Sequence, residues 1–360
     1  MKTNHDYTGK KIFVGIDVHK ATYSISVVCD GKLVKRDTLP AYPQRVVTYL
    51  QKFFNNAEIR SAYEAGFSGF GLHRHLKENG IDNIVVHAAS IEIGSRDRVK
   101  TDKRDSMKIA FQLSANRLRG IFVPSTEMED RRELSRLRST FVKDRNRIAA
   151  RLKQKANYYG LIGPEDSQKV CRQWIERLLR QPMGPGLRHV VNELVDQWET
   201  FNKKIKELDH LMEIQAVEDE EKEKVYRSVK GIGKTSARIL SNELGDMLQF
   251  SSERGLFSYT GLTPSEYSSG EHTRKGHISR QGKAVLRGIL IQCSWVAIKH
   301  DPNLREIFER IAKRAGCKRA IVAVGRRLIG RLRACFRNKT LYQVQTTEAV
   351  SEAILDEVVA

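Results

Sequence analysis

The sequence predicts an α/β N-terminal domain with a mixed sheet, a helical coiled-coil spacer and a mainly α-helical C-terminal domain. Short apolar runs of strand length alternate with helical segments near the N-terminus, a heptad pattern occupies the middle, and helix-length patterns dominate the rest. The 360 residues suffice for two or three domains with cores of their own. We expect domains at 1–125, 126–225 and 226–340, followed by an acidic tail at 341–360.

The first domain is expected to begin with three strands in a meander. Residues 11–29 contain two apolar runs, IFVGIDV and TYSISVVC, and a third strand at 32–38 follows the turn Asp30-Gly31. The remaining expected elements are a helix at about 42–54, a strand near 58–64, a helix near 69–79, a strand at 83–87 and a helix from about 105 to 118. This order is the one expected of a ribonuclease-H-like fold.

Four acids in this domain are candidates for a metal site. Asp17 closes a hydrophobic strand, where an ionised carboxylate without a partner is costly to bury. Glu64 ends another strand before glycine, and Asp102 and Asp105 share one face at the start of a helix. Together they predict an oxygen-rich pocket for Mg²⁺ or Mn²⁺, ions that can activate the attacking oxygen and stabilise the leaving oxygen of a phosphodiester. Taken singly, the helix acids could instead stabilise the helix dipole or pair with neighbouring lysine and arginine.

The charge balance indicates a polyanionic partner. The chain has 63 basic and 43 acidic residues, for a net charge of +20. Much of the excess lies in three stretches, 96–104, 131–155 and 310–339, which favours a nucleic acid over a generally basic surface. We therefore expect a nucleic acid as the partner.

Cysteines and apolar runs exclude several other classes. The five cysteines are scattered without a CxxC pair, so neither a zinc site nor a disulfide framework is predicted. The first residues, MKTNHDYTGKK, contain no hydrophobic signal region, and no apolar run reaches transmembrane length. We expect a reduced, cytoplasmic compartment and no membrane partner.

The spacer is predicted to contain two long helices. Residues 127–157 are helical and strongly charged, and the pattern breaks between about 163 and 186. It resumes in a seam of alternating spacings of three and four, formed by Leu194, Trp198, Phe201, Ile205, Leu208 and Met212. The two helices are expected to pack as an antiparallel hairpin, with a seam between subunits of a homo-oligomer, a dimer or tetramer, as the alternative.

Two segments of the third domain are candidates for phosphate contacts. In VKGIGKTSARILSNELG, Gly231 and Gly233 precede a helix that begins near Lys234, as in a helix-hairpin-helix element that offers backbone N–H groups to a phosphate. The alternative is a tight glycine turn before an ordinary helix. Residues 310–337 predict an amphipathic helix with one cationic face that includes Arg326, Arg327 and Arg331. A membrane-surface helix is possible, but the other basic segments favour nucleic acid.

Residues 255–292 are predicted to be loop-rich and to carry a reactive serine. Ser268 and Ser269 stand before Gly270, so either is a candidate nucleophile toward phosphate, although a serine hydroxyl needs activation and Ser-Ser-Gly is also common in ordinary loops. The cations that follow are candidate nucleic-acid contacts: Arg274, Lys275, Arg280, Lys283 and Arg287.

These motifs together resemble the DEDD transposases of bacterial insertion sequences, a family related to Piv-type DNA invertases that includes bridge-RNA-guided recombinases. The resemblance rests on VGIDVHK, YEAG and KTDKRDS, and on the downstream GIG and GLTPSEYSSGEHTRKGHISRQGKAVLR, and it covers roughly 11–120 and 225–335. It implies a Holliday-junction-resolvase-like domain that carries the metal, and a C-terminal transposase domain. Ser269 matches the serine that attacks DNA and holds it covalently, with Ser268 as the fallback.

The resemblance also implies donor and target DNA as partners, and oligomers in which the acids and the serine meet across subunits. In guided members it implies a noncoding RNA that pairs with the donor and target DNA. The sequence therefore predicts a recombinase that moves an insertion sequence. The alternatives are a stand-alone Holliday-junction resolvase, which would not need the serine region, and a non-catalytic nucleic-acid-binding protein, against which the intact acids argue.

Overall fold

A computed structural model describes residues 6–92, 101–163, 169–269, 272–279 and 281–344. The chain divides into two compact units, Met1–Pro124 and Ser125–Ala360, which are described separately.

The first unit contains a five-stranded mixed sheet in the order β3-β2-β1-β4-β5. Its strands are β1 (Lys11–Val18), β2 (Thr22–Cys29), β3 (Lys32–Pro40), β4 (Glu58–Glu64) and β5 (Asp82–Val86). The first three strands pair antiparallel, whereas β4 runs parallel to both β1 and β5. The predicted α/β domain with a mixed sheet is confirmed, and the meander followed by parallel strands is the arrangement that a ribonuclease-H-like fold requires.

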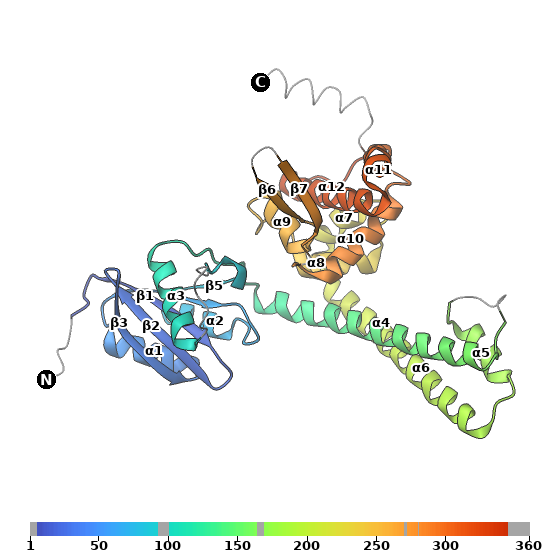
Figure 1. Ribbon diagram of the computed structural model, residues 1–360, viewed down its shortest axis with the longest axis horizontal. Coiled ribbons are helices and arrows are strands. Elements are labelled where there is room, and N and C mark those ends of the chain that lie inside the picture. The colour runs from blue at the N-terminus through green and yellow to red at the C-terminus, as the bar shows by residue number, and fades with distance from the viewer. Residues whose placement is uncertain (1–5, 93–100, 164–168, 270–271, 280, 345–360) are drawn as a thin grey trace, which may run out of the picture. The chain divides into compact units, whose positions relative to one another are not determined.

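Helices cover both faces of this sheet (Figure 1). The helices α1 (Pro43–Phe53) and α2 (Gly71–Glu78) share a core with Ile12, Val14 and Ile16 of β1. The helix α3 (Asp102–Ser114) packs on the opposite face, where a second core forms, and a short 3₁₀ turn, η1 (Ala88–Ser90), follows β5. Because side chains alternate along a strand, β1 turns one row of residues toward α1 and α2 and the other row toward α3.

The second unit begins with a pair of long antiparallel helices, α4 (Thr126–Tyr158) and α6 (Pro185–Ile214). Arg138 of α4 forms an ion pair with Asp209 of α6, and the rings of Phe141 and Phe201 lie 5.5 Å apart, centre to centre. Three residues of the predicted seam are buried: Ile205, Leu208 and Met212. The two helices therefore pair within one chain along the predicted seam.

A third helix in this region, α5 (Arg172–Arg180), was not predicted. It lies near the far ends of α4 and α6 (Figure 1) and buries Trp174, Ile175 and Leu178 against Leu152 and Val191. The turn residues on either side concealed it, since nine residues between glycine and proline clusters resemble a loop in sequence. The helix α5 therefore covers apolar side chains of α4 and α6.

The rest of the unit is mainly helical, with one core of its own. After the 3₁₀ turn η2 (Gln215–Asp219), its elements are α7 (Glu220–Arg227), α8 (Lys234–Leu244), α9 (Glu253–Thr260), β6 (Pro264–Ser269), β7 (His272–Ile278), α10 (Ala284–Ala297), α11 (Pro302–Ala315) and α12 (Cys317–Asn338). Within the described ranges, no helix combines the length and apolar character needed to cross a bilayer.

Two local expectations for this region were wrong. Residues 255–292 are not loop-rich, because α9, a β6–β7 hairpin and the start of α10 occupy most of them. The single helix expected at 310–337 is two helices, since Gly316, with φ of +82°, ends α11 and begins α12. At the start of the expected tail, Tyr342 still contacts the helical domain, since its backbone N–H donates to Ser228 Oγ at 2.9 Å. Residues 345–360 of the expected tail lie outside the described residues.

Candidate metal centre and nucleic-acid interface

Asp17 lies at the carboxyl end of β1, on the face that carries α3. It is paired in register with Ser24 of β2, and its side chain retains 21% exposure. Successive side chains of a strand point to opposite faces of the sheet. Because Ile16 is buried on the face that carries α1 and α2, Asp17 points to the face that carries α3. A half-buried carboxylate in this position is held rigidly by the centre of the sheet.

Gly15 allows α3 to approach this strand closely. A Cβ atom at Gly15 would lie 2.0 Å from the carbonyl oxygen of Ser106 and 2.4 Å from the backbone nitrogen of Ala110. The hydroxyls of Ser106 and Ser26 also share a hydrogen bond of 2.9 Å. This contact positions the first turn of α3, and therefore Asp102, beside the end of β1.

We expect Gly15→Ala to destabilise the first unit by about 3 kcal/mol, because the clash is with backbone atoms that cannot rotate away. The same change should displace Asp102 and weaken the binding of Mn²⁺. Chemical denaturation and calorimetry test both effects. Gly71→Ala is the matched control, since a Cβ there meets nothing within 4 Å. A Gly15→Ala protein as stable as the control would contradict this role.

A histidine that the sequence interpretation passed over completes the cluster. His19 Nε2 lies 3.0 Å from Asp17 Oδ2 and 3.3 Å from Asp102 Oδ2. One potential ligand atom from each of Asp17, His19 and Asp102 lies within 4.8 Å of the others. The signal for His19 was its spacing: two residues after Asp17, it falls on the same side of an extended chain.

The electrostatics of the cluster favour a cation. The pKa of Asp17 is raised, mainly by burial of its carboxyl group, and the negative charges of Asp102 and Asp105 add to this shift. The hydrogen bond from His19 opposes it, and the same bond to Asp17 is the chief cause of the raised pKa of His19. A divalent ion placed among these carboxylates would offset the repulsion that Asp102 and Asp105 exert on ionised Asp17.

The other two predicted acids lie around this cluster in different ways. Asp105 is half-buried, and its Oδ1 lies 3.6 Å from Lys108 Nζ. Glu64 ends β4 and is exposed, and it lies at the same end of the sheet as Asp17 because Ile16 and Tyr63 are paired in parallel register. The structure thus brings Asp17 and Asp102 together with His19, places Asp105 near them, and leaves Glu64 outside the three-residue cluster.

In the second unit, the candidate serines end a β-strand. Ser269 pairs with His272, and Ser268 pairs with Thr273, at the tip of the β6–β7 hairpin. The side chains of both serines, and all of Gly270, lie outside the described residues. The two serines therefore stand in a paired strand and not in the loop expected from the sequence.

The predicted cations of this region are distributed along the hairpin and its base. Arg274 and Lys275 are in β7, opposite Tyr267 and Glu266 in register, while Arg280 lies outside the described residues. Lys283 and Arg287 are at the hairpin base, where the Lys283 backbone N–H donates to Tyr259 O at 2.9 Å and the Arg287 side chain donates to Gly261 O at 3.5 Å.

Glycine contacts hold the hairpin base in place. A Cβ atom at Gly282 would lie 2.4 Å from the backbone nitrogen of Gly261 and 2.5 Å from the carbonyl oxygen of Tyr259. Gly261 itself has φ of +69°, a conformation that glycine adopts without strain. The backbone on either side of the hairpin is therefore in direct contact, which fixes the direction in which the hairpin leaves the helical domain.

The GIG segment forms the turn between α7 and α8. Gly231 has φ of +114°, and a Cβ there would lie 2.9 Å from the carbonyl oxygen of Cys293 in α10, so the residue is needed for packing. Gly233 directly precedes α8 and is exposed, and Lys234 forms an ion pair with Glu213 at 2.5 Å. Packing accounts for Gly231, whereas phosphate binding at Gly233 and Lys234 stays a prediction.

The three predicted arginines of α12 differ in their contacts. Arg326 lies over the ring of Phe257 at 4.7 Å, and Arg327 is exposed. The guanidinium of Arg331 donates to the buried carboxylate of Asp301 at 3.1 Å and to Tyr342 Oη at 2.9 Å. The charge of Arg331 is therefore balanced inside the domain, and we assign it a structural role in place of the predicted nucleic-acid contact.

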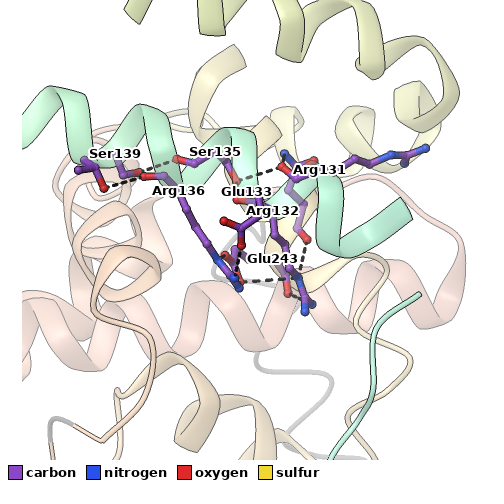
Figure 2. Close-up of polar contacts among 9 residues, drawn as sticks. Arg131, Arg132, Glu133, Ser135, Arg136, Ser139 and Glu243 are labelled. Atoms are coloured by element: carbon purple, nitrogen blue, oxygen red, sulfur yellow. Dashed lines mark hydrogen bonds and ion pairs between the residues drawn. The ribbon is translucent and has the colours of Figure 1, made fainter. Parts of the chain in front are cut away.

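Part of the basic stretch 131–155 also has an internal role (Figure 2). Arg132, which is buried, donates to the carbonyl oxygens of Asn242 and Glu243 at 3.1 and 2.8 Å, in the last turn of α8. Arg136 donates to Glu243 Oε1 at 2.9 Å. These bonds satisfy carbonyls that a helix end leaves unpaired and join α4 to the C-terminal helices. No local pattern predicts this contact, since its residues are more than a hundred positions apart in the chain.

Comparisons with known proteins agree with this organisation. Residues 14–159 match the family of DEDD transposases of the IS110 type, and residues 223–309 match the family described as Transposase IS116/IS110/IS902. The chain is 29% identical over 301 residues to the "Putative transposase y4qE" of Sinorhizobium fredii, covering 82% of this chain and 74% of that protein. It is 26% identical to the transposase for insertion sequence element IS1533 of Leptospira borgpetersenii, covering 91% of this chain and 96% of that protein.

A solved structure of Thermus thermophilus RuvC also matches, with 14% identity and a TM-score of 0.24, over 31% of this chain and 99% of that chain. The two family regions contain both the acid cluster and the serine hairpin, in the order predicted. The chain therefore belongs to the IS110-type family of DEDD transposases, enzymes that cut and transfer DNA in the movement of insertion sequences.

Proposed function

We propose that this transposase cuts and rejoins DNA with a divalent-metal site built on Asp17, His19 and Asp102 and with Ser269 as nucleophile, under the guidance of a bridge RNA. The observation that carries the proposal is the convergence of the three side chains at the end of β1, with their potential ligand atoms within 4.8 Å of one another. Asp105 and Glu64 are the further members of the acid set.

The residues of the cluster fit a divalent ion. Asp17 and Asp102 offer carboxylate oxygens and His19 offers a ring nitrogen. The pKa of Asp17 is raised mainly by burial, and the charges of Asp102 and Asp105 add a smaller repulsion that a cation would relieve. When bound, the ion supplies positive charge that stabilises the developing charge on a phosphodiester. Either Mg²⁺ or Mn²⁺ suits the carboxylates, and the imidazole of His19 favours Mn²⁺, since Mg²⁺ prefers oxygen ligands.

The proposed covalent step takes place at the tip of the β6–β7 hairpin. Ser269 Oγ attacks a DNA phosphorus, so that a serine–phosphate ester forms while the bond from phosphorus to one sugar oxygen breaks. The serine loses its proton and the released sugar oxygen gains one. Support comes from the position of Ser269 beside Gly270 within the matched family region, and Ser268 is the fallback.

Recognition of sequence is assigned to RNA. If a noncoding RNA pairs with donor and target DNA, the protein needs to bind backbones only, and basic residues such as Arg274, Lys275, Lys283 and Arg287 suit that task. We further propose a homo-oligomer, a dimer or tetramer, in which the acids of one subunit serve the serine of another. A stand-alone resolvase would need only the acids, and the matched region 223–309 argues against it.

The proposed function is tested by reconstitution. Purified protein is mixed with donor and target DNA, Mg²⁺ or Mn²⁺, and the RNA transcribed from the flank of the element. Recombinant junctions, read by sequencing, are expected only when protein, metal and RNA are all present. Junctions formed equally well without RNA would refute guidance, and their absence with either metal and every flanking transcript would refute the proposed activity.

Nucleic-acid binding is expected to be strongly salt-dependent. Each phosphate neutralised by a cation contributes about −0.9 to the slope of log K against log salt. Arg326→Ala with Arg327→Ala should therefore reduce the magnitude of the slope by about one, because Arg327 is exposed while Arg326 lies over the Phe257 ring. Fluorescence anisotropy over a salt series measures this. Arg147→Ala is the control, because Arg147 is already paired with Asp144 at 2.8 Å. An unchanged slope in the double variant would remove α12 from the interface.

A further inference from the structure

A hollow on the C-terminal domain, here called the α9–α12 pocket, is not used by the proposed reaction. It has a volume of about 510 Å³, within the range of small-ligand sites. Its lining combines an aromatic ring, two guanidinium groups and a carboxylate, contributed by Glu253, Phe257, Arg326, Arg327 and Gly330. These polar and charged side chains distinguish the pocket from an apolar packing cavity.

One wall of the pocket is a flat cation–aromatic stack. The guanidinium of Arg326 lies 4.7 Å from the centre of the Phe257 ring, and both side chains are half-buried. This arrangement holds a planar cation in one orientation. Unpaired nucleobases stack on aromatic rings and on guanidinium planes, so the wall is suited to one face of a base.

A carboxylate also lines the pocket. Glu253 lies one turn before Phe257 on α9, and its Oε1 would be 2.9 Å from a Cβ atom at Gly330 of α12. The missing side chain at Gly330 therefore leaves space for the carboxylate in the hollow. Among the residues that the structure describes, no ion pair neutralises Glu253, Arg326 or Arg327. The carboxylate is free to accept hydrogen bonds from a ligand.

Of the three arginines that line the pocket, Arg331 is bound by neighbouring residues, which leaves Arg326 and Arg327 to face a ligand. Arg331 donates to Asp301 and also to Asn303 of α11, at the edge of the hollow. That pairing removes its charge from the pocket. Arg326 is oriented by Phe257, while Arg327 is exposed and free to reach a phosphate. The pocket thus has a stacking surface, a hydrogen-bond acceptor and a phosphate-binding cation.

We propose that the α9–α12 pocket binds one unpaired nucleotide of a single-stranded nucleic acid, with a preference for guanine. An ionised carboxylate only accepts hydrogen bonds, and the two adjacent N–H donors of guanine, at N1 and N2, match its two oxygens. Uracil and thymine place carbonyl oxygens on both sides of their single N–H, which repel the carboxylate. The inference rests on the proposed function only in taking nucleic acid as the ligand.

The test measures anisotropy of a labelled short oligouridylate against the same strand with one central guanine, using the full chain. The guanine should improve affinity by about tenfold, the effect of a good bidentate contact. In Glu253→Gln the side chain has one acceptor and one donor, so the preference should move from guanine to adenine. Gly330→Ala should reduce the guanine preference by displacing the carboxylate.

Matched controls separate base recognition from general charge. Arg337→Ala removes an exposed cation elsewhere on α12 and should weaken all strands equally while keeping the guanine preference. Oligothymidylate with and without one guanine distinguishes DNA from RNA as the source of the nucleotide. Equal binding of strands with and without guanine would overturn the proposal, as would a preference that survives both Glu253→Gln and Gly330→Ala. Asp102→Ala should keep the preference, so failure of the metal site would leave this result intact.

Discussion

Replacing Asp102 with alanine is expected to abolish DNA strand cleavage while leaving the fold nearly intact. Asp102 lies at the exposed start of α3, so its loss removes no core contact, and it relieves repulsion against the half-buried carboxylate of Asp17. Loss of metal-based stabilisation of the transition state, about 4 kcal/mol or more, corresponds to roughly a thousandfold reduction in rate. Cleavage of labelled donor DNA and thermal denaturation of the same preparations measure the two expectations.

Asp17→Asn is the companion variant, because it keeps the shape of the half-buried side chain and removes its charge. It should be equally inactive. Asp82→Asn is the control for loss of an acid elsewhere in the first unit, since Asp82 only pairs with Arg60 and Lys77 on the surface. Normal cleavage by the Asp17 and Asp102 variants would show that the cluster is not the catalytic centre.

Replacing Ser269 with alanine should abolish strand exchange and remove the covalent protein–DNA intermediate. Without the hydroxyl no serine–phosphate ester can form, so the loss is expected to be complete within the sensitivity of a gel assay. The decisive measurement is mass spectrometry of the peptide attached to DNA after a stalled reaction. The adduct should map to Ser269 in the wild-type protein.

Ser265→Ala is a matched control in the same strand, whose hydroxyl donates to His277 O at 3.0 Å. It should retain the adduct. An adduct on Ser268 would move the assignment by one residue. Recombination by Ser269→Ala without any serine adduct would contradict a serine nucleophile and leave a mechanism that uses the acid cluster alone. If the two sites meet across subunits, mixed oligomers of Ser269→Ala and Asp102→Ala should regain activity that neither has alone.

The spacing of apolar residues and the positions of turn residues predicted the sheet and the long helices well, because these elements follow local sequence patterns. The strands that place Asp17 and Glu64 were expected within one or two residues of their ends, and Asp102 and Asp105 were expected at a helix start. The β6–β7 hairpin was missed because its glycines resemble loop residues, although Gly276 faces Ser265 across the strands and Gly282 contacts Gly261.

Tertiary contacts were beyond sequence reasoning for a physical reason: nothing local indicates which distant group a side chain meets. Arg132 and Arg331 looked like surface cations, yet each is bound within the fold, to helix carbonyls and to Asp301 respectively. His19 was not singled out as a ligand, because only the fold places Asp102 beside it. Net charge alone therefore overstates the surface available to DNA.

A metal centre at the end of β1 is tested most directly by titrating Mn²⁺ into metal-free protein by calorimetry, in the absence of DNA. Wild-type protein should show saturable binding that Asp17→Asn, Asp102→Ala and His19→Ala each weaken by at least about tenfold, while Asp82→Asn binds as the wild type does. Binding unchanged in all three cluster variants, or no saturable binding to the wild type with or without DNA, would contradict a metal centre at the end of β1.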